Sequence, residues 1–176
     1  MKFRFFPLMA LLGSVACSFA DENSVGSVVT IKVGDIREDA SSLEGWQYVS
    51  TGQPDSEVLS IVKAAGFTTI VDLRRTSEDH GMDEAAEVAA LGMQYVSLPI
   101  AGGDDVTFEN AAALDKILAD TDGPVLLHCA SGNRVGALFA LSAKLAGATN
   151  EDALAAGKVA GLTRLEGVVK ERLQEK

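Results

Sequence analysis

The stretch PVLLHCASGNRVGALFALSAKL, residues 124–145, decides the fold. It starts with a short apolar run, Val125–Leu127, which has the length and composition of a buried strand. A loop containing glycine follows, and apolar residues then recur every three or four positions, which indicates one face of a helix. Those positions are Val135, Leu138, Leu141 and Leu145. A strand that turns directly into a helix is the repeating unit of an α/β protein.

The same alternation extends along the rest of the chain. Further strands are predicted over residues 28–33, 46–50, 68–73 and 93–98, and further helices over residues 56–65, 83–91, 107–118, 150–160 and 164–175. Helix starts are marked by Asp55, by Thr107 and by a capping-box pattern at residues 163–166. The pattern predicts a single α/β domain with a central, mostly parallel sheet flanked by helices. Ligands of such sheets bind beyond the carboxyl ends of the strands, so the loops after Leu73, Leu98 and Leu127 are expected to carry the site.

The first twenty residues have the pattern of a secretory signal peptide. Lys2 and Arg4 precede an apolar run over residues 5–16, and small residues follow at 18–20, where a signal peptidase would cut. The run is short for a transmembrane span, so none is expected. We therefore divide the chain into a signal peptide (1–20), an N-terminal extension (21–44) and one domain (45–176), and expect a periplasmic or secreted protein. Lipid attachment at Cys17 is the alternative.

Charge and cysteine content narrow the classes of function. Removing residues 1–20 would take away two basic residues and move the formal net charge from −10 to −12. This acidity argues against nucleic acid or an anionic membrane surface as the partner. Cys129 would be the one cysteine left, and it cannot form an internal disulfide. A thiol of this kind in an exported protein is either buried and inert or reactive.

The loop after Leu127 combines the residue types that a phosphate-binding nucleophile needs. Backbone N–H groups of the loop Ala130, Ser131, Gly132 and Asn133 can converge on an anion where the helix begins. Their positive field would favour the thiolate of Cys129, and Arg134 can grip two phosphate oxygens with its planar fork. The alternative is that Cys129 is a small buried apolar residue and Arg134 a surface cation.

Three further stretches accompany this loop in the same order as in a known family. They are STGQP at residues 50–54, GFTTIVDLR at 66–74 and YVSLPI at 95–100. With these stretches the sequence resembles the tyrosine/dual-specificity phosphatase superfamily, and more closely its bacterial beta-lactamase-hydrolase-like group. The resemblance implies hydrolysis of a phosphorylated protein or small molecule through a phosphocysteine at Cys129, without a cofactor or metal.

Two features depart from the common tyrosine phosphatase loop. Four residues rather than five separate Cys129 from Arg134, although the bacterial group shares this short spacing. Val135 stands where a Ser or Thr hydroxyl usually helps to stabilise the thiolate. The resemblance also implies a general acid in the loop after Leu98, where Asp104 and Asp105 are the two candidates.

The remaining arginines and histidines near the strand ends are predicted to have structural rather than catalytic roles. Arg74 and Arg75 are expected to pair with Glu78, Asp79 or Asp83 rather than with substrate. His128 should point to the opposite face of the strand from Cys129 and play a hydrogen-bonded structural role. His80 has no distinguishing feature, and no metal-ligand cluster stands out.

Two other functions stay open at this point. Rhodanese-like sulfurtransferases also use a short cysteine loop, although the Gly-His-Ile segment expected after their strand is missing here. A non-catalytic phosphate-binding module would fit the short loop and Val135. An exported thiolate would also be prone to oxidation, so we expect activity to depend on a reductant.

Overall fold

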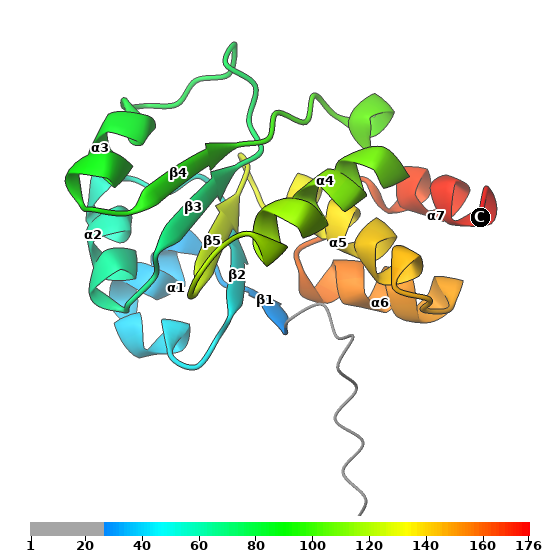
Figure 1. The fold of residues 1–176 in the computed structure, drawn as a ribbon, viewed down its shortest axis with the longest axis horizontal. Coiled ribbons are helices and arrows are strands. Elements are labelled where there is room, and N and C mark those ends of the chain that lie inside the picture. The colour runs from blue at the N-terminus through cyan, green and yellow to red at the C-terminus, as the bar shows by residue number, and fades with distance from the viewer. Residues whose placement is uncertain (1–26) are drawn as a thin grey trace, which may run out of the picture.

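The computed structural model describes residues 27–176 and shows one five-stranded sheet between two layers of helices (Figure 1). The strand order is β1-β2-β5-β3-β4, and each neighbouring pair is parallel. The strands are β1 Val28–Thr30, β2 Tyr48–Thr51, β3 Thr69–Asp72, β4 Gln94–Ser97 and β5 Val125–His128. The predicted α/β class is confirmed. Because all pairs are parallel, the carboxyl ends of the strands share one edge, with β5 at its centre.

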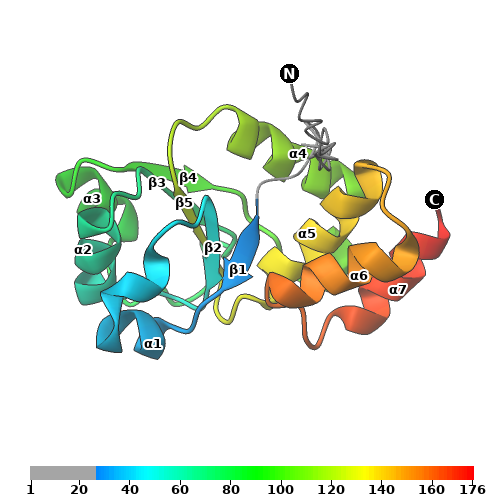
Figure 2. The same cartoon turned by 90° about the horizontal axis from the view of Figure 1, so that it is seen from below.

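The helices divide between the two faces of the sheet, as Figures 1 and 2 show. One layer contains α1 Val33–Glu38, α2 Ser56–Ala64 and α3 Glu84–Ala90. The other contains α4 Phe108–Ala119 and α5 Asn133–Leu145, with α6 Asn150–Val159 and α7 Glu166–Gln174 packed against α5. Two short 3-10 helices cover Ala40–Leu43 and Gly103–Asp105. Within residues 27–176 no helix has the length and apolar character that crossing a bilayer requires.

Side chains along the central strand alternate between the two layers. Leu126 is buried in the core formed with α1, α2 and α3, whereas Leu127 belongs to the core on the α4–α5 side. Cys129 lies in the second of these cores. His128 returns to the α3 side, where its Nε2 lies 2.8 Å from Oε1 of Glu84 in α3. The predicted opposition of His128 and Cys129 is therefore confirmed.

Two of the predicted helix caps form, and Asp83 and Thr149 add two more. Asp55, Asp83, Thr107 and Thr149 each accept a hydrogen bond from a backbone N–H in the first turn of α2, α3, α4 and α6. Such caps typically stabilise a helix by about 1 kcal/mol. The starts of these capped helices are therefore determined by local sequence, whereas α1, α5 and α7 have no side-chain cap.

The predicted capping box at residues 163–166 is wrong. Helix α7 begins at Glu166, and its N-cap residue, Leu165, makes no side-chain cap. The backbone N–H and the hydroxyl of Thr163 instead donate to Oδ1 of Asn133, at 2.8 and 3.1 Å. A tertiary contact has replaced the local one, because Asn133 is 7% exposed and needs partners for its amide.

The N-terminal segment 21–44 is packed into the fold over its described part. Strand β1 pairs with β2, and both Ile36 and Leu43 are buried in the core. The boundary placed at residue 45 stays a prediction, although residues 28–43 share the core of the domain. The predicted signal peptide, residues 1–20, and Cys17 lie outside the described residues.

Candidate active site

The cysteine loop lies at the middle of the edge formed by the carboxyl ends of the strands. Cys129 directly follows β5, and α5 begins at Asn133, so the loop turns within three residues. Gly132 has φ 78°, in the left-handed region that glycine adopts without strain. This conformation permits the sharp turn into the helix, as the sequence predicted. Cys129 itself has no exposed surface in this arrangement.

The end of β2 supports the loop from one side. Gly52 forms an isolated bridge with Ser131, and a Cβ atom on Gly52 would lie 3.4 Å from the carbonyl oxygen of Ala130. A Cβ atom on Gly132 would lie 3.4 Å from Ser50 Oγ. The STGQP stretch therefore packs against the cysteine loop. The hydroxyls of Ser50 and Thr51 are buried and have no hydrogen-bond partner among the described residues.

Arg134 joins the loops that follow β3 and β4. Its Nη1 donates to Glu78 Oε1 at 2.6 Å and to the Ile100 carbonyl oxygen at 2.8 Å, with the Leu73 carbonyl oxygen at 3.4 Å. Its Nη2 donates to Glu78 Oε2 at 2.7 Å. The guanidinium is thus fixed from two sides, and its side chain is 11% exposed.

These contacts leave one edge of the Arg134 guanidinium without an oxygen acceptor. A guanidinium has five N–H donors. Both N–H groups of Nη1 and one of Nη2 donate to Glu78 and to the two backbone carbonyl oxygens. The Nε–H and the second Nη2–H donate to no oxygen within residues 27–176. This pair of parallel donors matches the geometry of two phosphate oxygens.

Both members of the Glu78–Arg134 pair are held in their charged forms. The hydrogen bond from Arg134 lowers the pKa of Glu78 to about 2. The hydrogen bond to Glu78 raises the pKa of Arg134 above its ordinary value although burial opposes the rise, and the nearby Cys129 side chain is a smaller cause in the same direction. The pair is therefore ionised at neutral pH, and Cys129 lies close enough to interact with Arg134 electrostatically.

The two predicted general acids lie on the 3-10 turn of the loop after β4. Asp105 Oδ2 accepts a hydrogen bond of 2.6 Å from the Ala101 backbone N–H, and its carbonyl oxygen accepts one from Asn110. Asp104 is exposed, and its carboxylate accepts no hydrogen bond from the described residues. The structure thus gives Asp105 a role in shaping the loop and leaves Asp104 unengaged.

Of the four predicted phosphate-loop residues, Ala130 and Ser131 are exposed and Gly132 and Asn133 are buried. The side-chain oxygen of Asn133 accepts hydrogen bonds from the segment before α7. Donors of Asn133 toward an anion would therefore be its backbone N–H and its side-chain Nδ2, because its side-chain oxygen is already an acceptor.

A buried polar cluster occupies the opposite side of the sheet from Cys129. Arg74 donates to Asp72 through Nε and Nη2, each at 2.9 Å, and Nη2 also donates to Glu84. His128 Nε2 lies 2.8 Å from Glu84 Oε1. The predicted pairing of Arg74 with Glu78, Asp79 or Asp83 is wrong. The Arg74 side chain is buried and forms ion pairs with the buried carboxylates of Asp72 and Glu84 instead. Arg75 does pair with Glu78, at 3.8 Å.

The family assignment follows from comparison with known sequences. The family model described as "Beta-lactamase hydrolase-like protein, phosphatase-like domain" matches residues 30–146. The chain belongs to this family. Beta-lactamase hydrolase-like proteins of Xylella fastidiosa and Agrobacterium fabrum are both 31% identical to it, over 106 and 100 residues. The matches cover 58% and 54% of this chain but 24% and 23% of those proteins, so the chain spans about a quarter of the length of its curated relatives.

Solved structures agree on the fold. A candidate phosphatase from Neisseria meningitidis superposes with a TM-score of 0.63 at 19% identity, covering 76% of this chain and 94% of the other. The kinase-associated phosphatase, solved with its catalytic cysteine replaced by serine, gives 0.54 at 15% identity, covering 78% and 93%. This phosphatase-like domain therefore has the cysteine phosphatase fold.

Within the phosphatase-like domain, Asp72, His80 and Glu84 bring possible metal-ligating atoms within 4.8 Å of one another. The sequence had indicated no such group. Arg74 already donates to both carboxylates and places a cation between them. We therefore assign no metal to this cluster.

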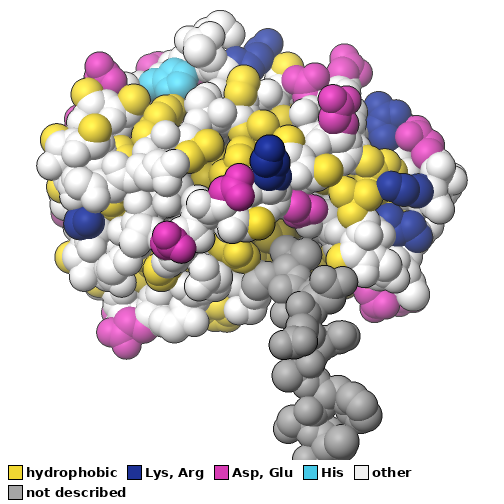
Figure 3. Space-filling model, in the orientation of Figure 1, with side chains coloured by type: hydrophobic (Ala, Val, Ile, Leu, Met, Phe, Trp, Pro, Cys, Tyr) yellow, Lys and Arg dark blue, Asp and Glu magenta, His cyan; other side chains and the backbone are white. Residues whose placement is uncertain are grey.

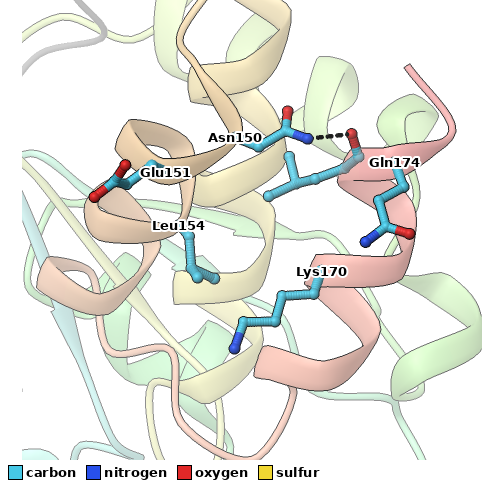
Figure 4. Close-up of a pocket in the computed structure, with 6 residues that line it drawn as sticks. Asn150, Glu151, Leu154, Lys170 and Gln174 are labelled. Carbon is cyan, nitrogen blue, oxygen red and sulfur yellow. Dashed lines mark hydrogen bonds between the residues drawn. The ribbon is translucent and has the colours of Figure 1, made fainter.

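A surface hollow lies away from the cysteine loop, between α6 and α7 (Figure 4). It has a volume of about 290 Å³ and is lined by Asn150, Glu151, Leu154, Lys170, Leu173 and Gln174. Asn150 Nδ2 donates to the Leu173 carbonyl oxygen at 3.0 Å across it. The hollow contains neither a nucleophile nor a residue of the cysteine loop, so it is separate from the candidate active site.

Sequence reasoning named Glu78 only as a partner of Arg74 or Arg75 and missed its contact with Arg134, and it did not single out Glu84. Both follow β3, whose carboxyl end borders the site, but acidic residues are common in loops and first helical turns. The sequence did offer one indication of their role: both residues follow β3, and the carboxyl end of β3 lies beside the cysteine loop. The face drawn in Figure 3 shows scattered acidic and basic side chains and no continuous patch of one charge.

Proposed function

We propose that the protein hydrolyses phosphomonoesters through a phosphocysteine intermediate, with Cys129 as nucleophile. The observation that carries this proposal is the position of Arg134: one edge of its guanidinium is fixed by Glu78, and the other has two parallel donors free of oxygen acceptors. A phosphate group held by this edge would lie in the loop that starts at Cys129. Membership of the phosphatase-like family supports the same reaction class.

The first step transfers the phosphoryl group to sulfur. The Cys129 thiolate attacks phosphorus, a P–S bond forms, and the bond from phosphorus to the ester oxygen breaks. Arg134 and the backbone N–H groups of the loop stabilise the charge on the equatorial oxygens. The leaving oxygen takes a proton from Asp104 or Asp105 and departs as an alcohol or phenol.

The second step releases phosphate. Water attacks the phosphocysteine, the P–S bond breaks, and inorganic phosphate leaves while the thiolate is regenerated. The aspartate that gave its proton in the first step accepts one from this water. Because Cys129 is fully buried, we infer that the surrounding loops must separate before an ester can reach the sulfur. The glycines at 102 and 103 give the loop after β4 the freedom to do so.

The test is hydrolysis of an aryl phosphate under reducing conditions by the wild type, Cys129→Ser and Arg134→Ala. The proposal requires turnover by the wild type and its loss in both variants. Sulfur transfer from thiosulfate to cyanide is assayed in parallel. Sulfur transfer without phosphate release would identify a sulfurtransferase instead, and phosphate binding without either activity would identify a binding module.

A further inference from the structure

The turn that leads into α7 is attached to the cysteine loop. The side-chain oxygen of Asn133, the residue before Arg134, accepts hydrogen bonds from the Thr163 backbone N–H at 2.8 Å and from the Thr163 hydroxyl at 3.1 Å. The Leu165 backbone N–H donates to the same oxygen at 3.3 Å. Because Asn133 is 7% exposed, these three bonds lie inside the protein. The N-terminal end of α7 is therefore held at a fixed place relative to the nucleophile's loop.

The body of α7 contacts the loop after β4, which carries the two candidate general acids. Arg172 Nε donates to the carbonyl oxygen of Val106 at 3.1 Å, one residue beyond Asp105. At the start of the 3-10 turn, a Cβ atom on Gly103 would lie 3.2 Å from a methyl group of Val168. Val106 is fully buried in a core cluster that includes residues of α7. The turn thus has an apolar contact with α7 at its start and a polar contact with α7 just after its end.

Within residues 27–176, Arg172 makes the only hydrogen bond that joins loop residues 101–106 to a distant part of the chain. The loop's other hydrogen bonds in this described part connect positions at most five apart, such as Ala101 with Asp105 and Asp105 with Asn110. Apolar packing alone is not directional, whereas a hydrogen bond weakens steeply when its geometry is lost. The Arg172 side chain is 32% exposed, so the bond is partly shielded from water. Arg172 therefore fixes where the loop lies against α7.

We propose that Arg172 is a positioning residue for the general acid: its bond to Val106 holds the loop of the two candidate aspartates at the distance from the cysteine loop that protonation of the leaving oxygen requires. Helix α7 acts as the brace, because its other end is attached to Asn133. This inference rests on the proposed function, since it takes an aspartate of this loop as the general acid. The family match ends at residue 146, so Arg172 lies outside the part of the chain that the match covers.

The kinetic test compares Arg172→Met with the wild type on two esters under reducing conditions. Methionine keeps a long side chain but has no donor for the Val106 carbonyl oxygen. We expect kcat to fall about 10-fold with an alkyl phosphate, whose leaving oxygen needs a proton, and by less than about 2-fold with an activated aryl phosphate. Arg172→Lys keeps N–H donors on a long stem and should recover part of the loss. Equal losses with both esters would mean that Arg172 supports only the fold, and would overturn the proposal.

Two matched variants separate the bond to Val106 from other effects of charge on α7. Lys170→Met removes a cation from the same helix, where Lys170 pairs with Glu166 at 2.7 Å. Glu175→Gln removes the carboxylate that lies 2.9 Å from Arg172 Nη1 and leaves the Nε donor in place. Both are expected to keep the wild-type ratio of the two kcat values. A fall in that ratio as large as the one in Arg172→Met would contradict the proposal.

Hydrogen–deuterium exchange measures the position of the loop without any turnover. The backbone N–H groups of Ala101 and Thr107 are both bonded to Asp105 inside the loop. Peptides that cover residues 101–107 should exchange about 5-fold faster in Arg172→Met, as the loss of one hydrogen bond predicts, and peptides from β5 should be unchanged. Unchanged exchange in the loop, or faster exchange in both regions, would overturn the proposal.

The two readouts distinguish failure of this inference from failure of the proposed function. A wild-type protein that releases no phosphate would sink the proposed function, while exchange would still show whether Arg172 fixes the loop. Normal phosphate release with loop exchange that does not respond to Arg172→Met would sink the inference alone.

Discussion

Glu78 places both oxygens of its carboxylate on the end of the Arg134 guanidinium, with Oε1 2.6 Å from Nη1 and Oε2 2.7 Å from Nη2. A bidentate pair fixes the plane of the guanidinium as well as its position. The residue that fixes the orientation of the Arg134 guanidinium is therefore 56 positions away in the sequence.

Replacing Glu78 with Gln should lower kcat/KM for an aryl phosphate about 10-fold, because a neutral amide cannot hold the guanidinium plane as a carboxylate does. Steady-state kinetics under reducing conditions measure this. Asp79→Asn is the control, since Asp79 lies in the same loop and accepts from the Gly81 backbone N–H instead. Higher activity in Glu78→Gln would mean that Glu78 competes with phosphate for Arg134.

The Glu78–Arg134 pair should also contribute to stability in a defined pH range. The folded-state pKa of Glu78 is about 2 and its ordinary value is 4.5, so the fold favours the ionised form. Its contribution, at most about 3 kcal/mol, should be complete above pH 4.5 and be lost as the pH falls toward 2. Urea unfolding of the wild type and Glu78→Gln at several pH values measures it. A difference that grows as the pH falls would contradict this assignment.

Helix α5 crosses α6 closely enough that Gly136 cannot carry a side chain. A Cβ atom there would lie 2.1 Å from the Leu162 nitrogen and 2.7 Å from the Gly157 carbonyl oxygen. Gly136→Ala should lower the free energy of unfolding by at least about 2 kcal/mol, because backbone must move to admit the methyl group. Gly34→Ala is the matched control: nothing lies within 4 Å of its Cβ position in α1. It should stabilise the protein slightly, as alanine favours the helix.

The general acid can be identified from leaving-group dependence. The variant that lacks it should lose about 10²-fold in kcat with an alkyl phosphate and far less with an activated aryl phosphate, whose leaving group needs no proton. Asp104→Asn and Asp105→Asn are compared with both substrates. Asp105→Asn should in addition lower thermal stability, since Asp105 accepts from the Ala101 backbone N–H. Equal losses with both substrates would exclude a role in protonating the leaving group.

Oxidation should inactivate the protein reversibly. A reactive Cys129 thiolate would be oxidised by mild peroxide, and beyond residue 20 the chain has no second cysteine with which to form a protecting disulfide. Activity after peroxide treatment should therefore return when dithiothreitol is added. Equal activity with and without dithiothreitol would show that Cys129 is not a reactive thiolate.

Local sequence predicted much of this protein. The strands and most of the helices follow from apolar periodicity, although α1 Val33–Glu38 was missed and the strand predicted over residues 28–33 ends at Thr30. The starts of α2 and α4 follow from Asp55 and Thr107, because a cap is satisfied within one helical turn. The turn into α5 follows from Gly132, since its backbone conformation suits glycine. These features depend on neighbours within a few residues.

Contacts between distant residues were decided by the tertiary structure. Periodicity identifies strands but not their order, and the insertion of β5 between β2 and β3 brings His128 beside Asp72. The same order brings Arg134 within reach of Glu78. Charged side chains have many possible partners along a sequence, and burial selects among them because an unpaired buried charge is costly. The sequence by itself thus determined the cysteine loop, and the packing of the sheet determined which carboxylates support it.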